Sequence, residues 1–276
     1  MRSKYIVKDI LSELTSILSP TISRASREAQ LLLMEFLKKD ELWLLTNQNT
    51  EIKDIIGVRE LAKRRSMNEP LEYIINSVSF YSEEFFIKEG ALIPRPETEL
   101  LIDEVKKNYP DSNANIRFVE VGVGSGIISI MLAKYYVNAH FIAIDISQDA
   151  LDIAKINIEK FNLSNKIELR LGNLLDEVNE SIDYLVSNPP YIEDGIVLEK
   201  NLSYEPQNAL FGGKIGDEII KKLLDEVLKQ NIKFFSCEIG YDQQDKIRNY
   251  LKDKDFKSIE FYKDYSGFDR GFTLKV

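Results

Sequence analysis

The sequence predicts an α/β fold, in which a small N-terminal helical domain precedes a Rossmann-like, doubly wound sheet of seven strands. Two observations predict the sheet: short apolar runs alternate with amphipathic stretches from residue 116 onward, and a glycine-rich turn follows the first of these runs. A third observation predicts the helical domain, because apolar side chains over residues 1–75 recur at the three- and four-residue spacing of a helix.

The hydrophobic pattern divides the chain into three parts. Residues 1–75 are predicted to form a helical bundle, with its main helices near 4–18, 25–37 and 52–61. Residues 76–93 place aromatic side chains on both sides of a polar triplet, which predicts a β-hairpin linker. Residues 94–276 form the second domain, which opens with Pro96 and two glutamates, residues suited to the first turn of a helix.

Seven strands are expected in the second domain, at 117–121, 140–144, 167–171, 182–187, 234–239, 258–262 and 271–276. Helices are expected between them, near 127–136, 148–161, 216–230 and 243–252. Only residues 263–270 separate the last two strands, and a loop this short joins strands in an antiparallel pair. The final strand is therefore predicted to run against the others.

Composition narrows the function classes. The 276 residues carry a net charge of −9, which disfavours a broad surface for binding nucleic acid. The one cysteine, Cys237, and the one histidine, His140, exclude a disulfide within the chain and Cys- or His-rich metal sites, so no metal is expected. No apolar run approaches the roughly 20 residues that span a bilayer, and the N-terminus lacks a signal-peptide core. A monomeric, cytoplasmic protein without membrane partners is expected.

The glycine-rich turn predicts a cofactor site. It reads Glu120-Val121-Gly122-Val123-Gly124-Ser125-Gly126 and lies between the first strand and the next helix. A dinucleotide fingerprint needs glycine where Ile127 stands, and no Lys-Ser/Thr pair follows, which excludes a phosphate-binding P-loop. Asp145, at the end of the second strand, can accept hydrogen bonds from both hydroxyls of a ribose, and Glu120 can help hold an ammonium. Together they favour S-adenosylmethionine over NAD. The alternative for Asp145 is a helix N-terminal charge beside Ser147.

A second candidate element, Asn188-Pro189-Pro190-Tyr191, follows the fourth strand. Each proline fixes its own φ and restricts the residue before it, so Asn188 and Pro189 present their carbonyl groups as a fixed pair of acceptors. Tyr191 adds a flat face for stacking. The element is suited to grip a planar NH2 group, either an amide or the exocyclic amine of a base. Asn173, after the third strand, is a candidate contact to adenine, and a plain turn is the alternative there.

At these residues the chain resembles the HemK/PrmC family, the N5-glutamine methyltransferases of peptide chain release factors. The resemblance covers residue 24 to the C-terminus, and the Asn-Pro-Pro-Tyr element is shared with adenine-N6 methyltransferases. Two segments are more particular to the family, Ile93-Pro-Arg-Pro-Glu-Thr-Glu99 and Tyr204-Glu-Pro206 with Ala209-Leu-Phe-Gly-Gly213. Further matches lie at 69–73, 80–86, 120–126, 143–147, 186–192 and 238–241. The sequence departs from the family at Val123, where threonine is frequent, and at Asn173, where aspartate is common.

The resemblance implies a class I methyltransferase sheet at 94–276 and a release factor docking role for 1–75. It also implies that the acceptor is the glutamine of the Gly-Gly-Gln loop in class 1 release factors, with S-adenosyl-L-homocysteine as the second product. Asn188 and the Pro189 carbonyl would accept both amide hydrogens while Tyr191 packs on the amide plane; Asn188 would also line the cofactor site. The rivals are an adenine-N6 methyltransferase of DNA or RNA, a glutamine methyltransferase of a ribosomal protein, and a non-catalytic cofactor-binding protein.

Overall fold

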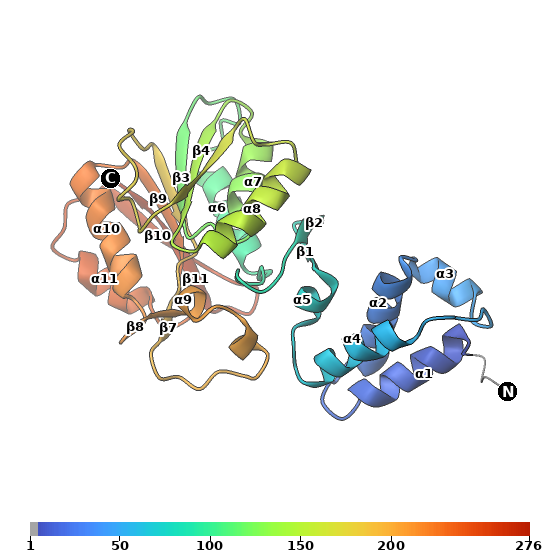
Figure 1. The fold of residues 1–276 in the computed structure, drawn as a ribbon. Helices are drawn as coiled ribbons and strands as arrows, with labels where there is room; N and C mark the ends of the chain where they lie inside the picture. The colour runs from blue at the N-terminus through green and yellow to red at the C-terminus, as the bar shows by residue number, and fades with distance from the viewer. Residues whose placement is uncertain (1–4) are drawn as a thin grey trace. The chain divides into compact units, whose positions relative to one another are not determined.

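The computed structural model describes residues 5–276, which form two compact units (Figure 1). The first unit runs to Ser77 and also takes in Glu199–Tyr204, and the second comprises Val78–Leu198 and Glu205–Val276. The predicted first helix begins at residue 4, which lies outside the described residues, as does the start of the predicted 1–75 domain. A segment from late in the sequence therefore belongs to the first unit, which the pattern of the sequence did not indicate.

The first unit contains five helices among its described residues: α1 Val7–Leu18, α2 Ala25–Leu37, α3 Glu41–Thr46, α4 Ile56–Ser66 and α5 Leu71–Ile75. Their apolar faces form one core, in which Leu14 and Leu32 are fully buried. The third predicted helix was placed too early, at 52–61. The backbone N–H of Ile52 donates to the Tyr5 carbonyl at 2.8 Å instead, so the chain is extended there and α4 begins later.

Helix α3 contains Trp43, the one tryptophan of the chain. Asp40 caps this helix, because its Oδ1 accepts a hydrogen bond from the Trp43 backbone N–H at 2.7 Å. The Lys39 ammonium lies 5.7 Å from the centre of the indole ring. The tryptophan is thus held within the first unit by a cap and a cation–π contact.

The hairpin consists of β1 Ser77–Phe80 and β2 Glu83–Phe86, with its turn at Tyr81 and Ser82. Both turn residues have positive φ, 54° and 62°. Glu99 supports this turn, since its Oε1 accepts a hydrogen bond from the Tyr81 N–H at 2.6 Å. Phe80 and Phe85 are buried in the core of the second unit, so the hairpin packs as part of that unit.

The second unit is built on a seven-stranded sheet with the order β10-β11-β9-β6-β3-β4-β5. The strands are β3 Arg117–Val121, β4 His140–Asp145, β5 Ile167–Leu171, β6 Tyr184–Ser187, β9 Phe234–Glu238, β10 Ser258–Lys263 and β11 Asp269–Lys275. Strand β11 pairs antiparallel with both β9 and β10, while β9, β6, β3, β4 and β5 are parallel. The predicted α/β class and the direction of the last strand are confirmed.

Helices cover both faces of this sheet (Figure 1). On one face, α6 Thr98–Asn108, α7 Ile127–Tyr135 and α8 Gln148–Lys160 enclose a core with a row of rings across neighbouring strands. Phe141, Phe118, Tyr184 and Phe234 stack with centroids 4.9, 5.2 and 5.2 Å apart. On the other face, α10 Glu218–Gln230 and α11 Gln244–Leu251 pack over Val119 and Ile142. Successive side chains of a strand point to opposite faces of the sheet, so each strand contributes to the core on either face.

Between β6 and α10 the chain makes a long excursion that the sequence analysis left without elements. It contains β7 Ile192–Glu193, the 3-10 turn Leu202–Tyr204, α9 Gln207–Leu210 and β8 Phe211–Gly213, and β7 pairs with β8 in a separate two-stranded sheet. Among residues 5–276, none of the helices combines the length and the apolarity needed to cross a membrane.

Candidate active site

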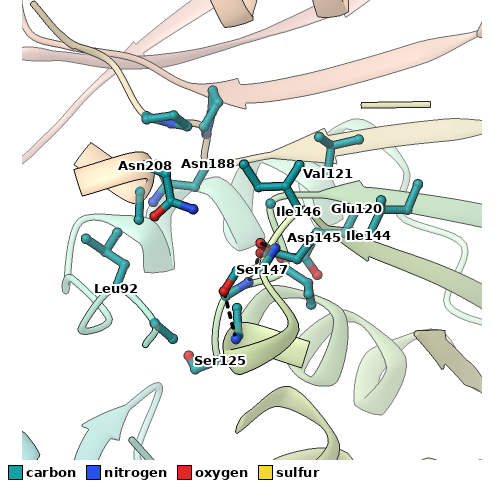
Figure 2. A pocket seen from close by; sticks show the side chains of 18 of the residues that line it. Leu92, Glu120, Val121, Ser125, Ile144, Asp145, Ile146, Ser147, Asn188 and Asn208 are labelled. Atoms are coloured by element: carbon teal, nitrogen blue, oxygen red, sulfur yellow. Dashed lines mark hydrogen bonds between the residues drawn. The ribbon is translucent and has the colours of Figure 1, made fainter. Parts of the chain in front are cut away.

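A pocket lies at the carboxyl ends of β3, β4 and β6. Strand β3 pairs with β4 on one side and with β6 on the other, so this is where the strand order reverses and where such sheets bind ligands. Figure 2 shows Asn188 and Asn208 on one side of the pocket, with Glu120, Asp145 and Ile146 on the other. The lining comes from the segments 90–98, 120–128, 144–150, 172–174, 188–190 and 206–209, together with Ile219.

The glycine turn forms the floor between β3 and α7. Gly122, Gly124 and Gly126 have φ of 78°, 53° and 84°, the left-handed region that side chains with a Cβ rarely adopt. A Cβ built on Gly124 meets no atom within 4 Å, so its backbone faces open space in the pocket. Val123 directs its side chain into the core, and its N–H donates to the Ile144 carbonyl at 3.0 Å. Backbone, not side chains, therefore forms this part of the lining.

Asp145 joins the turn to the end of β4. One carboxylate oxygen accepts from the Gly124 N–H at 2.9 Å and the other from the Ser147 N–H at 2.9 Å. Burial raises the pKa of this carboxyl, and the backbone N–H donors oppose that rise. The cap of α8 is Ser147, whose hydroxyl oxygen accepts from the Ala150 N–H at 3.3 Å. Each Asp145 oxygen keeps a lone pair for a further donor in the pocket.

Glu120 is fully buried, and only one of its two carboxyl oxygens has a hydrogen-bond partner among the described residues. Its Oε2 accepts from the Ser129 N–H at 2.9 Å and from the Ser129 hydroxyl, whereas its Oε1 has no hydrogen-bond partner among residues 5–276. Burial raises the pKa of Glu120 to about 8. An unpaired buried carboxylate oxygen beside a pocket is costly unless a cationic donor reaches it. This atom therefore fits an ammonium group of a ligand.

The ends of β4 and β5 add two further lining residues. Ile146, which follows Asp145, is 56% exposed although it is a large apolar side chain, and it lines the pocket. Asn173 also lines the pocket, and its carbonyl accepts from the Asp176 N–H at 3.1 Å in a turn. No side-chain hydrogen bond of Asn173 is found in the described part of the chain. The sequence pattern predicts a contact at Asn173, whereas it gives no signal for Ile146.

Asn188 is held in one orientation by residues far away in the sequence. Its Nδ2 donates to the Thr98 hydroxyl oxygen at 3.1 Å, and the Thr98 hydroxyl donates to Glu238 Oε2 at 2.7 Å. The Asn188 Oδ1 receives no hydrogen bond from residues 5–276. Tyr191 joins the same network, since its hydroxyl donates to Glu238 Oε1 at 3.2 Å. Burial raises the pKa of Glu238 to about 7, and burial also raises the pKa of Tyr191.

Glycines and a glutamine fix the backbone of the Asn-Pro-Pro-Tyr element from behind. A Cβ on Gly212 would lie 2.4 Å from the Pro190 carbonyl oxygen, so only glycine allows this approach. Gln243 donates from Nε2 to the carbonyl oxygens of Tyr191 and Gly216, both at 3.1 Å. The element is thus rigid through its surroundings as well as through its prolines.

A second loop, which contains Pro94 and Arg95, completes the pocket. The buried Glu205 holds this loop, because its Oε2 accepts from the Ile93 N–H at 2.9 Å and its Oε1 pairs with the Arg95 guanidinium. The sequence pattern predicts the start of a helix after Pro94 and Arg95 but assigns no role to Arg95 or Glu205. Their contacts join positions about a hundred residues apart, and no local pattern could have predicted them.

Comparisons with known proteins agree with this arrangement. The model of the PrmC N-terminal domain matches residues 9–75, and that of the methyltransferase small domain matches residues 96–205. A release factor glutamine methyltransferase of Clostridium acetobutylicum is 35% identical over 276 residues, with 96% of each chain covered. One of Dictyoglomus turgidum is 38% identical over 256 residues, with 90% of each covered.

Solved structures with the same fold are more distant in sequence. The catalytic domain of hMettl16, in complex with the MAT2A 3'UTR hairpin 6, has a TM-score of 0.59 at 15% identity, covering 78% of this chain and 82% of that one. A ribosomal protein L11 methylase from Lactobacillus delbrueckii subsp. bulgaricus has a TM-score of 0.50 at 21% identity, covering 68% and 83%. At these identities the likeness concerns the fold alone.

Proposed function

Because this chain belongs to the release factor glutamine methyltransferase family, we propose that it methylates the side-chain amide nitrogen, N5, of the glutamine in the Gly-Gly-Gln motif of class 1 peptide chain release factors. The methyl donor is S-adenosylmethionine. The observation that carries the proposed acceptor is the carboxamide of Asn188, whose nitrogen is tied to Thr98 while its Oδ1 stays open at the pocket. The proposed location is the cytoplasm, where release factors act.

The hydrogen-bond acceptors and backbone that line the pocket fit S-adenosylmethionine. Asp145 offers lone pairs to the two ribose hydroxyls, and the unpaired Glu120 Oε1 suits the ammonium of the methionine part. The turn from Gly122 to Gly126 offers close backbone approach. The exposed Ile146 gives an apolar surface for the adenine ring, beside Asn173. The bound cofactor supplies an electrophilic methyl group on a positively charged sulfur.

The acceptor side has to make a poor nucleophile react, because the lone pair of an amide nitrogen is delocalised into its carbonyl. We assign Asn188 Oδ1 and the Pro189 carbonyl as acceptors for the two N–H groups of the substrate glutamine. Held in this way, the amide nitrogen presents its lone pair toward the methyl group, with the Tyr191 ring packed on the amide plane. Positioning of this kind lowers a barrier by about 7–11 kcal/mol in favourable cases.

No side-chain base is required before methyl transfer. The N-methylated amide cation is a strong acid and loses its proton readily once the new bond has formed. Glu238, the buried carboxylate that holds Thr98 and Tyr191, already accepts hydrogen bonds on both oxygens. The chemistry therefore depends on orientation and not on general base catalysis.

Methyl transfer from radiolabelled S-adenosylmethionine tests the proposed acceptor. The purified full chain is offered a class 1 release factor, a DNA duplex, ribosomal RNA and ribosomal proteins in parallel. We expect label in the release factor alone, and none when its Gly-Gly-Gln glutamine is replaced by alanine. Label in nucleic acid or in a ribosomal protein would instead support one of the rival enzymes, and no transfer to any acceptor would support a non-catalytic protein.

We further propose that the helical unit docks the body of the release factor. This unit has its own core and exposes large apolar side chains, among them Leu42 and Leu45 on one face of α3, which are 68% and 63% exposed. Removal of residues 1–75 with the hairpin retained should raise KM for whole release factor more than tenfold, because the extended contact is lost. KM for a short Gly-Gly-Gln peptide should change little. Equal rises for both acceptors would contradict the docking role, and cofactor affinity reports whether the truncated chain is folded.

A further inference from the structure

We propose that Thr98 and Glu238 are positioning residues for methyl transfer, which fix the carboxamide of Asn188 and the ring of Tyr191 in the orientation that the acceptor amide needs. This inference rests on the proposed function and deepens it. Neither residue faces the reacting atoms in the assigned mechanism. Both act through side chains that do.

The three groups form a continuous hydrogen-bonded chain. Asn188 Nδ2 and the Thr98 hydroxyl oxygen are 3.1 Å apart, and the Thr98 hydroxyl oxygen and Glu238 Oε2 are 2.7 Å apart. Thr98 and Glu238 are each 1% exposed, so water does not compete for these bonds. The chain joins the start of α6, the end of β9 and the loop after β6, three places that meet only in the folded unit.

The direction of donation along this chain follows from the proton count. A carboxylate can only accept, and a threonine hydroxyl has a single proton. Thr98 therefore gives its proton to Glu238 and can only accept from Asn188. That requirement places the NH2 of Asn188 toward Thr98 and its Oδ1 toward the pocket. The ionised Glu238 thus selects between two carboxamide orientations that have nearly the same shape.

The same carboxylate also orients the aromatic residue of the element. The Tyr191 hydroxyl donates to Glu238 Oε1 at 3.2 Å, so one oxygen of Glu238 holds Tyr191 and the other holds Asn188 through Thr98. The Tyr191 carbonyl is held separately by Gln243 at 3.1 Å. One buried group therefore sets the acceptor oxygen and the stacking surface together.

Several charged or titratable groups surround Glu238. Arg270 of β11 lowers its pKa and Glu97 before α6 raises it. Tyr191 donates a hydrogen bond to it, and Tyr262 of β10 and Cys237 interact with it electrostatically. Burial is the largest of these influences, and together they raise the pKa of Glu238 to about 7. When Glu238 is protonated at Oε2, that oxygen becomes a donor and the Thr98 proton is free to turn to Asn188. The preference for one carboxamide orientation is then lost.

Thr98→Val tests the proposal, because valine has the shape of threonine but cannot accept from Asn188. We expect kcat to fall about 10- to 100-fold, the usual cost of removing a supporting contact behind a functional group. KM for S-adenosylmethionine should stay within about twofold, because the groups assigned to hold the cofactor are the glycine turn, Asp145 and Glu120. Thr98→Ser, which restores the hydroxyl, should recover most of kcat. A Thr98→Val enzyme with unchanged kcat would overturn the proposal.

Thr273→Val is the matched control. Thr273 is also 1% exposed and hydrogen bonded, with its hydroxyl 2.7 Å from that of Ser236, but it lies away from the pocket on β11. This variant should lower the melting temperature as Thr98→Val does and keep kcat. Equal losses of kcat in the two variants would mean that both act through general destabilisation, and the positioning role would be wrong.

The pH profile gives a readout that a merely structural role would not change. In the wild-type enzyme kcat should fall with a one-proton slope below about pH 7, since protonation of Glu238 removes the carboxylate. Glu238→Gln should be slow at every pH and should lack this limb. A retained limb in Glu238→Gln would assign the titration to another group and contradict the proposal.

A direct measurement keeps this inference separate from the identity of the acceptor. The protein is labelled with 15N-asparagine, and the Asn188 side-chain NH2 signal is identified by its loss in Asn188→Ala. The signal should shift in Thr98→Val and in Glu238→Gln and stay in place in Thr273→Val. This result is expected whether or not the release factor accepts methyl groups. An unmoved signal would refute the hydrogen-bonded chain even in an active enzyme.

Discussion

Glu120 and Glu238 are buried carboxylates on parallel strands of one sheet, β3 and β9, and they serve opposite halves of the pocket region. Burial raises both pKa values, to about 8 and about 7. Glu120 leaves one oxygen unpaired beside the pocket, whereas both oxygens of Glu238 are occupied by Thr98 and Tyr191. The Glu120 carboxyl is therefore completed only by a ligand, whereas the Glu238 carboxyl is fully hydrogen bonded in the free protein.

The difference between Glu120 and Glu238 separates a group that binds the ligand from a group that orients other side chains. A group with an open lone pair contributes free energy only when a ligand arrives, so its removal should weaken affinity. A group whose partners are all internal contributes rigidity, so its removal should slow the reaction and leave affinity unchanged. The following substitutions test this division between the cofactor half and the acceptor half, from the largest expected effect to the smallest.

Asn188→Ala should have the largest effect, a loss of kcat on the order of 100-fold or more. The substitution removes the carbonyl that accepts from the substrate amide and leaves the glycine turn and Asp145 intact. Calorimetric affinity for S-adenosylmethionine should change by no more than a few-fold. Near-normal turnover in this variant would refute the role of Asn188 as an acceptor, and a large loss of cofactor affinity would remove the division between the two halves.

Asp145→Ala should instead weaken S-adenosylmethionine binding by about 10- to 100-fold, which corresponds to the net loss of about one hydrogen bond to a charged group, roughly 1.5–3 kcal/mol. Isothermal titration calorimetry measures this change. Asp183→Ala is a matched control, since Asp183 also accepts from a backbone N–H, that of Arg117 at 3.0 Å, but lies away from the pocket. The control should affect stability alone. Unchanged cofactor affinity in Asp145→Ala would exclude the ribose contact.

The ionisation of Glu120 should have a smaller effect on the affinity for S-adenosylmethionine, and this effect should depend on pH. In the free protein its pKa of about 8 keeps it largely protonated at pH 7, and an ammonium ligand favours the ionised form. Binding should therefore release a proton at pH 7, and affinity should rise several-fold with pH until about 8. Calorimetry in buffers of different ionisation enthalpy measures the release. Glu120→Gln should abolish it, and an equal release in that variant would place the proton on another group.

The raised pKa of Glu120 should also make the free energy of unfolding depend on pH. Because the folded-state pKa of Glu120 lies above its ordinary value of 4.5, the free folded chain binds more protons than the unfolded chain between these two pH values. The contribution of Glu120 to the free energy of unfolding should therefore decrease as pH rises from about 4.5 to about 8. Saturating cofactor should remove most of this decrease, as thermal melts at several pH values would show.

Much of the fold was predictable because regular elements carry periodic patterns. The strand at Arg117–Val121 and the helix at Gln148–Lys160 were predicted to within a residue or so of their observed ends. The predictions were wrong or incomplete where tertiary contacts, and not the local sequence, determine the secondary structure. Ile52 has the spacing of a helical residue, yet it pairs with the chain at Tyr5. The short strands β7 and β8 owe their pairing to the glycines that pack against the Asn-Pro-Pro-Tyr backbone, which no periodicity reveals.

The candidate site was predictable where its chemistry is local. The prolines after Asn188 and the glycines around Gly124 restrict or free their own backbone, so their roles follow from adjacent residues. Thr98 and Glu238 could not be found in this way, because they lie 140 residues apart and act through a chain of hydrogen bonds. The local pattern predicts a helix start at 94–99 and a strand at 234–239, but it assigns no role to these two side chains. Contacts of the supporting side chains require the folded coordinates.

The position of Trp43 gives the molecule a built-in optical probe. The chain has 13 tyrosines and 14 phenylalanines but a single tryptophan, which lies on α3 in the helical unit. Light at 295 nm, which excites indole selectively, would therefore report on that unit alone, whereas circular dichroism of the backbone reports on both. If the two signals melt at different temperatures, the units unfold independently. The proposed docking of a release factor on the helical unit predicts a change in Trp43 emission, which needs no added label.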